Sequence, residues 1–297
     1  MNSQYRILAI VVTFNRCEIT LRALNSIKAQ TLPPEASLNI ALVDDASTDG
    51  TLDAVRAKFP DIFLLKSTGN LFWAGAMRLG FKSFWMSNRY THLLVFNDDC
   101  IFYPNAISQM INSYRDQIKR ESYKSIGSVV VGSFHDGYSD MPTYGGQESH
   151  SSISPVMLRP LKPSSDIQYA DTLNMNLALI DKATIDAIGF ISNSYAHGFG
   201  DFDFGFRAKE RGVKIIVIPG FQGICLRNSK SGTWEDSKLD FATRLRLIVG
   251  PKGLSLAPRL HYLKTHAGIF WPLIYVWPYL KFIFNSTLGA VSRHLRS

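Results

Sequence analysis

The chain has 297 residues, of which 46% are hydrophobic and 19% charged. This length suits one large α/β domain, or one domain with an appendage, and the composition excludes an intrinsically disordered protein. All 24 acidic residues lie at or before Asp240, whereas eight of the 32 basic residues follow it, so the charges of residues 1–240 sum to zero. A nucleic-acid-binding protein would carry its basic residues on the main body, so we expect no nucleic-acid partner.

Short apolar runs alternate with amphipathic segments along most of the chain. The runs predicted to be strands are residues 7–14, 38–43, 62–65, 92–97, 126–131, 173–180 and 213–218. The segments predicted to be helices are residues 18–30, a segment that begins near 51, residues 73–88, a segment that begins at 104, and residues 182–188 and 201–211. Apolar strands that alternate with helices indicate an α/β fold, with a mostly parallel sheet flanked by helices on both faces.

Two stretches depart from this alternation. Residues 132–168 are rich in Gly, Ser, Pro and Tyr and show little periodicity, so we expect a functional or mobile loop there. After Asp240 the composition becomes basic and aromatic. We therefore predict a domain over residues 1–240 and a C-terminal helical extension over residues 241–297.

The extension contains an almost entirely apolar stretch at residues 267–284, interrupted by Pro272, Pro278 and Lys281. Four Trp and Tyr residues in this stretch, with basic residues on both sides, are typical of a segment that lies in a membrane interface. We expect residues 255–297 to bind an anionic membrane surface. A helical cap on the main body or on a second subunit, and a single membrane span, remain alternatives.

The cysteines and the N-terminus bear on the compartment. Cys17, Cys100 and Cys225 are far apart and form no C-x-x-C pair, which supports neither a disulfide framework nor a structural zinc site. The first residues lack the basic start, apolar stretch and cleavage site of a signal peptide. We expect a cytoplasmic protein that is peripheral on the inner face of the cell membrane.

Acidic residues follow two of the predicted strands. Asp44 and Asp45 come at the end of the second strand, and Asp98 and Asp99 follow the fourth. Ligands of such sheets bind beyond the carboxyl ends of the strands, so we expect both pairs to face one crevice. Mg²⁺ or Mn²⁺ would fit Asp98 and Asp99, because hard cations take oxygen ligands and bring phosphates. For Asp45, a turn is an equal alternative.

A third acidic motif lies at residues 197–207, where a loop becomes a helix. Asp201 falls in the first helical turn, where the helix dipole favours a carboxylate, and we predict that it is a general base. The alternatives are that Asp201 caps the helix and that Asp203 pairs with Arg207 at i, i+4. The phosphate-binding motifs G-x-x-x-x-G-K-[ST] and G-x-G-x-x-G are absent from the sequence, which argues against a Walker-type NTPase and a Rossmann dehydrogenase.

Four blocks in order resemble glycosyltransferase family 2 of the GT-A fold, in its bacterial polysaccharide, rhamnosyltransferase-like form. The blocks are VVTFNR (11–16), VDDASTDGT (43–51), GNLFWAGAMRLG with LLVFNDD (69–80 and 93–99), and GFGDFDFGFRAKERG (198–212). The resemblance runs from about residue 7 to residue 228. It implies an inverting, metal-dependent enzyme that moves a sugar from a nucleoside-diphosphate sugar to a hydroxyl of a glycan, in bacterial surface polysaccharide synthesis such as that of lipopolysaccharide O-antigen. An aspartate at the base site suits the imide N–H of uracil or thymine, so we expect a UDP- or dTDP-sugar, and the membrane-binding extension leads us to expect a lipid-linked acceptor.

The resemblance also implies roles for individual residues. Asp201 would be the catalytic base, and Asp99 would bind Mn²⁺ or Mg²⁺. The residues expected to contact the nucleotide are Thr13, Phe14, Asn15, Asp44, Asn70, Asn97 and Asp98. Those expected to contact the acceptor or the donor sugar are Asn174, Asn176, His197 and Asp203.

The sequence differs from the family pattern at three positions. Gly200 stands where the family usually has Glu, Phe72 replaces a usual glycine, and Cys225 stands near the place where many members have a His close to the metal. Two other functions remain open. One is a non-catalytic, membrane-associated scaffold that keeps the nucleotide-binding fold. The other is a sugar-phosphate nucleotidyltransferase, although its Gly- and Arg-rich loop after the first strand is missing.

Overall fold

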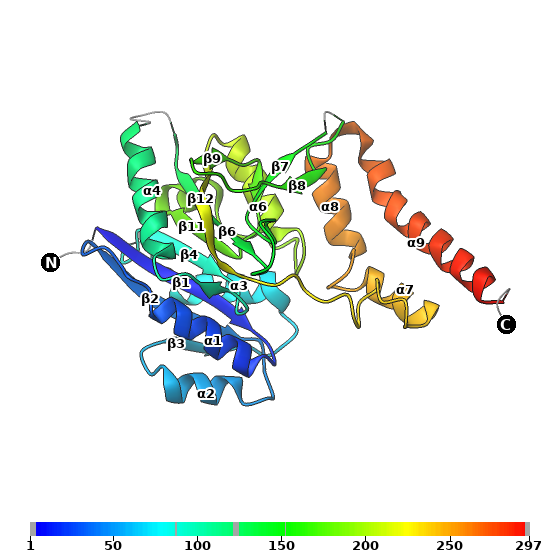
Figure 1. Cartoon of the computed structure of the whole chain (residues 1–297), viewed down its shortest axis with the longest axis horizontal. Coiled ribbons are helices and arrows are strands. Elements are labelled where there is room, and N and C mark those ends of the chain that lie inside the picture. The colour runs from blue at the N-terminus through cyan, green and yellow to red at the C-terminus, as the bar shows by residue number, and fades with distance from the viewer. Residues whose placement is uncertain (1–3, 87, 121–124, 152, 295–297) are drawn as a thin grey trace. The chain divides into compact units, whose positions relative to one another are not determined.

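The computed structural model describes residues 4–86, 88–120, 125–151 and 153–294 (Figure 1). The chain divides into two compact units. The first comprises the residues up to Glu148 together with Arg159–Arg227, and the second comprises Ser149–Leu158 and the residues from Asn228 onward. The division thus falls after Arg227, ahead of the boundary predicted after Asp240, and it assigns a short internal segment to the second unit.

The main sheet lies in the first unit. Its strands are β1 (Tyr5–Thr13), β2 (Ala36–Asp44), β3 (Phe63–Lys66), β4 (His92–Phe96), β5 (Ile101–Phe102), β6 (Ser128–His135), β9 (Gln168–Tyr169), β11 (Leu177–Asp181) and β12 (Lys214–Ile224). Over the described residues their order is β3-β2-β1-β4-β11-β6-β12-β5, with β9 paired to β12. The first four strands along the chain are parallel, whereas β11 runs antiparallel to β4 and β6. The predicted mostly parallel sheet is confirmed.

Helices cover both faces of this sheet. They are α1 (Cys17–Lys28), α2 (Thr51–Lys58), α3 (Phe72–Phe84), α4 (Ala106–Arg120), α5 (Lys182–Ile188) and α6 (Gly200–Glu210). Ile7, Ala9 and Val11 of β1 share one core with side chains of α1, α2 and α4. On the other face α3 comes very close, since a Cβ added to Gly80 would lie 2.7 Å from Val43 Cγ2. The alternation of apolar strands and helices therefore produces the α/β layers that it predicts.

Two differences from the predicted elements matter for the site. The stretch 132–168 contains β7 (Gly146–Ser149) and β8 (Leu158–Pro160), which form a second sheet with β10 (Thr172–Leu173). The strand predicted over 173–180 is interrupted after β10, and residues 174–176 form a short connection to β11. Strands of two to four residues are too short to show a period of two, so the sequence pattern did not reveal them.

Strained backbone gathers in the loops beside the strand ends. Among the described residues, the non-glycine residues with positive φ are Asn15, Ala46, Asn70, Phe72 and Phe199. The first three lie in the loops that follow β1, β2 and β3, Phe72 is the first residue of α3, and Phe199 precedes α6. Such conformations cost about 1–3 kcal/mol each and persist only where the surroundings enforce them. This edge of the sheet is therefore a candidate for function.

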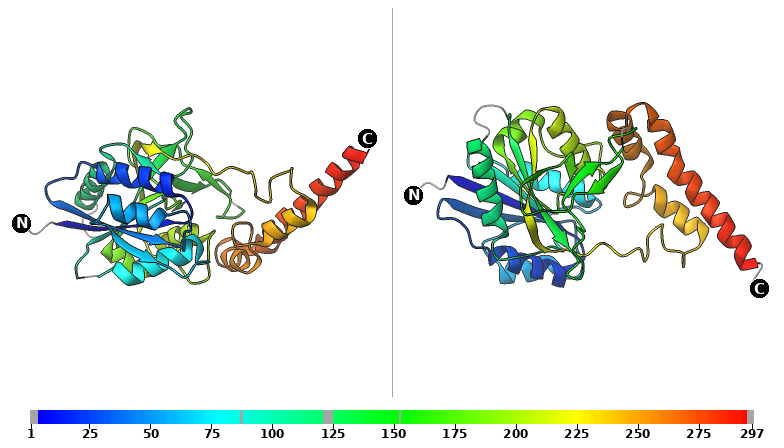
Figure 2. Two further views of the ribbon diagram at one scale, coloured as in Figure 1. Left: turned by 90° about the horizontal axis from the view of Figure 1, so that it is seen from below. Right: turned by 45° about the horizontal axis from the view of Figure 1, so that its top comes forward.

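The second unit is helical and contains α7 (Phe241–Val249), α8 (Leu256–His266), the 3₁₀ turn η1 (Gly268–Phe270) and α9 (Trp271–His294) (Figure 2). Pro278 lies inside α9 and has no N–H to donate to the carbonyl of Ile274, four residues earlier. Arg259 of α8 donates instead to the carbonyls of Ile274 and Tyr275, and it lies over the Tyr275 and Tyr279 rings. This arginine therefore ties α9 to α8.

The other side of α9 carries an exposed apolar stripe. Its members, at spacings of three and four residues, are Leu273, Val276, Trp277, Leu280, Ile283 and Phe284. Leu273 is 71% exposed and Trp277 is 65% exposed. None of the helices in the described part of the chain has the length and apolar character needed to cross a membrane. The predicted helical extension with exposed aromatic residues is confirmed.

Candidate active site

Asp44 lies at the carboxyl end of β2, where it is the register partner of Thr13 at the end of β1. Both side chains are buried. The Asp44 Oδ1 atom accepts a hydrogen bond from the Ser47 backbone N–H at 2.9 Å, whereas its Oδ2 atom is buried and has no hydrogen-bond partner among the described residues. An unsatisfied buried acceptor costs about 1–3 kcal/mol, so this oxygen is suited to a donor brought by a ligand.

Asn15 joins the two loops at this edge. Its backbone N–H donates to Ser47 Oγ at 2.8 Å, and its Oδ1 atom accepts from the Thr48 backbone N–H at 2.7 Å. The neighbouring Phe14 is exposed. Asn15 thus joins the β1–α1 loop to the β2–α2 loop through these two hydrogen bonds.

Asp45 has a different environment from its neighbour. Its carboxylate accepts hydrogen bonds from the backbone N–H groups of Leu71 and Phe72, at 3.2 and 2.9 Å, and from the Ser67 hydroxyl at 2.6 Å. These contacts hold the start of α3 and the preceding loop, in which Asn70 has φ of +62°. Asp45 therefore supports the loop, and Asp44 is the member of the pair with a free oxygen.

Arg16 bridges the second acidic pair. Its Nη1 atom lies 2.8 Å from Asp98 Oδ1, and its Nη2 atom lies 3.1 Å from Asp99 Oδ2. Burial raises the pKa of Asp98 to about 6, and the Arg16 charge opposes this rise. Next to this pair, Asn97 Oδ1 accepts from the Trp73 indole N–H at 2.9 Å. The sequence reasoning assigned no role to Arg16, although a base just after one strand end, facing acids after another, was an available signal.

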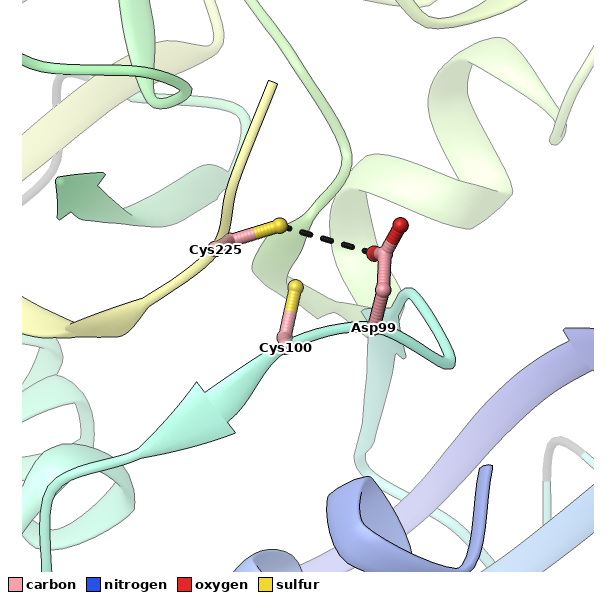
Figure 3. A group of neighbouring side chains, drawn as sticks. All are labelled: Asp99, Cys100 and Cys225. Atoms are coloured by element: carbon pink, nitrogen blue, oxygen red, sulfur yellow. Dashed lines mark hydrogen bonds between the residues drawn. The ribbon is translucent and has the colours of Figure 1, made fainter. Parts of the chain in front are cut away.

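Two thiols lie beside Asp99 (Figure 3). Ligand atoms of Asp99, Cys100 and Cys225 are within 4.8 Å of one another, and the Cys225 thiol donates to Asp99 Oδ1 at 3.5 Å. The Asn176 side-chain amide lies 3.6 Å from Cys225 Sγ and 3.9 Å from Cys100 Sγ. A carboxylate oxygen with a neighbouring thiol is a donor set that fits a divalent cation, with Asp99 as its oxygen ligand.

Asp201 lies in the first turn of α6. Its Oδ1 atom accepts from the Phe202 backbone N–H at 2.9 Å, and its Oδ2 atom accepts from the Asn174 amide at 3.4 Å. Burial raises the pKa of Asp201 to about 6, against the lowering effect of these two hydrogen bonds. A carboxylate with a pKa near 6 is ionised at neutral pH and is a better proton acceptor than an ordinary aspartate.

One short connection touches both acidic centres. Asn174 contacts Asp201, whereas Asn176, two residues further on, contacts Cys225 and accepts from the Asn97 backbone N–H at 3.4 Å. The Asn174 Oδ1 atom is itself held by Gln147 Nε2 at 2.7 Å. Asn176 is buried and lies next to both cysteine sulfurs, and Asn174 lies beside Asp201. Residues 174–176 therefore bring the candidate base and the candidate cation ligand into one neighbourhood.

Asp203 is bound within the protein. It is buried and accepts from the Tyr195 hydroxyl at 3.1 Å and from Arg207 Nε at 2.7 Å. Arg207 also donates to the carbonyls of Ile188 and Phe190. The pairing of Asp203 with Arg207 at i, i+4 is the structural alternative that the sequence offered for this residue.

The structure gives a physical reason for one departure from the family pattern, at Gly200, and shows the backbone that favours the family's glycine at Phe72. A Cβ added to Gly200 would lie 3.0 Å from Ile191 Cγ2, so this position has little room for a Glu side chain. Phe72 has φ of +53°, a region that glycine adopts freely and bulky residues rarely adopt. Its ring lies 6.3 Å from that of His197, the remaining residue predicted to contact a sugar.

This geometry agrees with the comparison with protein families. Residues 8–145, slightly less than half of the chain, match the family described as "Glycosyl transferase family 2". This region of the chain is therefore similar to glycosyl transferase family 2. No curated protein sequence gives a significant match.

Solved structures share the fold at low sequence identity. TarS of S. aureus has a TM-score of 0.53 at 14% identity over 82% of this chain, and residues 1–349 of TarS in complex with UDP give 0.53 at 15% identity over 87%. The mannosyltransferase PcManGT of Pyrobaculum calidifontis, in complex with GDP-Man and Mn²⁺, gives 0.52 at 15% identity over 98%. The chain covers 42% of the longer TarS chain, 70% of the shorter one and 77% of PcManGT. These likenesses show the GT-A fold.

Proposed function

We propose that this protein is an inverting glycosyltransferase that moves a sugar from a UDP- or dTDP-sugar to a hydroxyl of a lipid-linked glycan, in bacterial surface polysaccharide synthesis. The observation that carries the proposal is the connection 174–176. It contacts the candidate base Asp201 through Asn174, and it contacts the cluster around Asp99 through Asn176. A sugar transferase needs these two centres on either side of the anomeric carbon.

The chemistry is a single displacement. The acceptor oxygen bonds to the anomeric carbon, the bond from that carbon to the diphosphate oxygen breaks, and the hydroxyl proton passes to the Asp201 carboxylate. Hydrogen bonds from Phe202 and Asn174 orient this carboxylate. A divalent cation at Asp99 would neutralise negative charge on the leaving diphosphate. Because only one displacement occurs, the anomeric configuration is inverted.

The nucleotide would bind beyond the ends of β1 and β2. Asp44 Oδ2, buried and without a partner in the described part of the chain, would accept the imide N–H of a uracil or thymine ring. Thr13 and Asp98 would lie near the ribose, and Phe14 and Asn15 would border the base. The UDP named in a TarS complex supports a uridine nucleotide.

Thermal melting against UDP, dTDP, GDP, ADP and CDP, with and without Mn²⁺, tests this assignment. A ligand at a hundred times its dissociation constant stabilises the folded state by about 2.7 kcal/mol. We expect the largest shift with UDP or dTDP, and we expect it to need the cation. An absence of any shift would contradict the proposal and favour the non-catalytic scaffold.

Asp44→Asn sharpens the test, because it keeps the carbonyl that bonds the Ser47 N–H and replaces the free oxygen with an amino group. It should abolish most of the uridine-dependent shift. Asp53→Asn is the matched control, since Asp53 is an exposed residue of α2. The control should melt with the same shift as the natural protein.

The second unit would hold the enzyme on an anionic lipid surface. The apolar stripe of α9 is exposed, and no acidic residue follows Asp240 in the sequence. An apolar helix face, in a segment whose charged residues after Asp240 are all basic, complements an anionic bilayer. This arrangement would bring the transferase to an acceptor that is carried on a membrane lipid.

A further inference from the structure

The protein offers Asp99 a sulfur partner in place of a second oxygen or nitrogen ligand. We propose that Cys225 binds as a thiolate, as the second protein ligand of the cation at Asp99, and that the site therefore prefers Zn²⁺ or Co²⁺ to Mg²⁺. The inference deepens the proposed function, and the role of the cation in sugar transfer rests on that function. The cation site itself is argued from the positions of Asp99 and Cys225 and does not depend on the proposed activity.

The spacing of the two ligand atoms already suits a bound metal. Cys225 Sγ lies 3.5 Å from Asp99 Oδ1. In a tetrahedral zinc site, with Zn–O of about 2.0–2.2 Å and Zn–S of about 2.3 Å, the two ligand atoms are roughly 3.5 Å apart. Figure 3 shows both side chains directed at the same space. A cation can enter between them as the thiol proton leaves for solvent, and the metal–sulfur bond replaces the S–H bond.

The other oxygen of Asp99 is already engaged. Its Oδ2 atom pairs with Arg16 Nη2 at 3.1 Å, which fixes the carboxylate and leaves Oδ1 on the Cys225 side. The neighbouring Asp98 is held by the same guanidinium. The carboxylate is therefore oriented by the protein before any cation arrives.

Neighbouring groups distinguish the two thiols. The Asn176 amide points a donor at both sulfurs, at 3.6 Å from Cys225 Sγ and 3.9 Å from Cys100 Sγ, so it lies closer to Cys225. The Cys100 thiol donates to the Asn176 backbone carbonyl at 3.5 Å, and its side chain is fully buried. Cys100 is thus engaged as a donor, and Cys225 is the sulfur directed at Asp99.

The backbone next to Cys225 is closely packed and hydrogen-bonded. Gly223 pairs with Phe102 in the β5–β12 ladder, and a Cβ at this position would lie 2.1 Å from the Ile101 carbonyl oxygen. The Cys225 backbone N–H donates to His135 at 3.0 Å. This close approach holds the end of β12, which immediately precedes Cys225, against β5, which begins two residues after Asp99.

The chemistry of the ligands determines the preference. Thiolates favour Zn²⁺ and Co²⁺ over Mn²⁺, and they bind Mg²⁺ poorly because Mg²⁺ takes oxygen ligands. A site with oxygen ligands alone follows the same order of cations, but with a smaller difference between Zn²⁺ and Mg²⁺. The size of the preference for Zn²⁺ over Mg²⁺ therefore reports whether sulfur is a ligand.

Cobalt titration tests the proposal directly, because a thiolate bound to Co²⁺ gives a charge-transfer band in the near ultraviolet. The partly exposed Cys17 is first replaced by Ser to remove the third thiol. In this background we expect the band on adding Co²⁺. Cys225→Ser should lose the band and bind Co²⁺ more than about tenfold more weakly, since even loss of an outer partner costs 10–100-fold.

Cys100→Ser is the matched control and should keep the band. A band that survives Cys225→Ser, or that disappears only in Cys100→Ser, would overturn the assignment. In competition, Zn²⁺ should displace Co²⁺ at lower concentration than Mn²⁺, and Mg²⁺ should be the weakest competitor. Displacement by Mg²⁺ as effective as that by Zn²⁺ would also overturn it.

The nucleotide-dependent melting shift separates the two proposals. A shift with UDP and Mn²⁺ in a protein that gives no cobalt band contradicts the thiolate ligand and leaves the transferase proposal standing. A cobalt band in a protein that shows no shift with any nucleoside diphosphate supports the metal site and contradicts the transferase proposal.

Discussion

Two regions of the molecule each hold a pair of neighbouring acidic residues, and the members of each pair differ in the same way. At the end of β2, Asp45 is saturated by three donors of the protein, whereas Asp44 keeps a buried oxygen without a partner in the described chain. At the start of α6, Asp203 is held by Tyr195 and Arg207, whereas Asp201 has weaker contacts and a raised pKa. Hydrogen-bond saturation thus separates structural acids from candidates for ligand binding.

The largest expected effect concerns Asp201. Asp201→Asn should lower the rate of sugar transfer by about 10²–10⁴-fold, because the acceptor hydroxyl loses its proton acceptor. The nucleotide-dependent melting shift should stay unchanged. Single-turnover transfer and thermal melting of the same preparation measure both, and unchanged turnover would contradict the mechanism.

Asp203→Asn should have the opposite profile. It leaves the Arg207 guanidinium without its carboxylate partner, which should lower the free energy of unfolding by about 2–4 kcal/mol. Where the variant is folded, the rate of transfer should stay close to that of the natural protein. Urea unfolding followed by fluorescence measures the loss of stability. A stable but inactive Asp203→Asn protein would contradict the structural role assigned to Asp203.

The pH profile sharpens the same contrast. Because the pKa of Asp201 is raised to about 6, its carboxylate is protonated below pH 6 and ionised above it. We expect kcat/KM to fall about tenfold per pH unit below 6 and to be level above it. The nucleotide-dependent melting shift over the same range is the control, since a parallel decline would assign the titration to Asp98.

A smaller effect is expected at Arg259. Arg259→Met keeps apolar packing against the tyrosine rings but leaves the Ile274 carbonyl without the donor that Pro278 cannot provide. The second unit should be destabilised by about 1–3 kcal/mol, whereas nucleotide binding by the first unit should be unaffected. Hydrogen exchange of the α8 and α9 amides would detect this local loss, and unchanged protection would contradict the assigned role of Arg259.

Substitutions in the apolar stripe of α9 should change stability least, but they should clearly reduce binding to lipid vesicles. The double variant Trp277→Glu and Leu280→Glu should reduce co-sedimentation with vesicles that contain anionic lipid, because both side chains are exposed. Tyr138→Glu, at the exposed Tyr138 of the first unit, is the control and should bind as before. Retained binding of the double variant, or a loss of self-association without any vesicle binding, would contradict the membrane role.

The sequence predicted the layers of the fold because long apolar strands and amphipathic helices each carry a clear period. It also placed Asp44, Asp98, Asp99 and Asp201 at strand and helix ends, where the structure finds them. The pattern could not show that the strand predicted over 173–180 breaks at residues 174–176, because apolar residues continue through the break. The family resemblance placed Cys225 near the metal, and the position of Arg16 after a strand end was a usable signal, but the contacts of these two residues with Asp98 and Asp99 depend on strands that are distant in the sequence.

The bond from Arg259 to the Ile274 carbonyl has a consequence for how this chain can change. The guanidinium replaces the backbone N–H donor that Pro278 lacks. It donates to the Ile274 carbonyl, which lies 15 residues further along the chain. An insertion or a deletion in the turn between α8 and α9 would move that carbonyl out of register with its donor. Arg259, Pro278 and the length of the turn therefore depend on one another. In related sequences, we expect these three features to be conserved together or lost together.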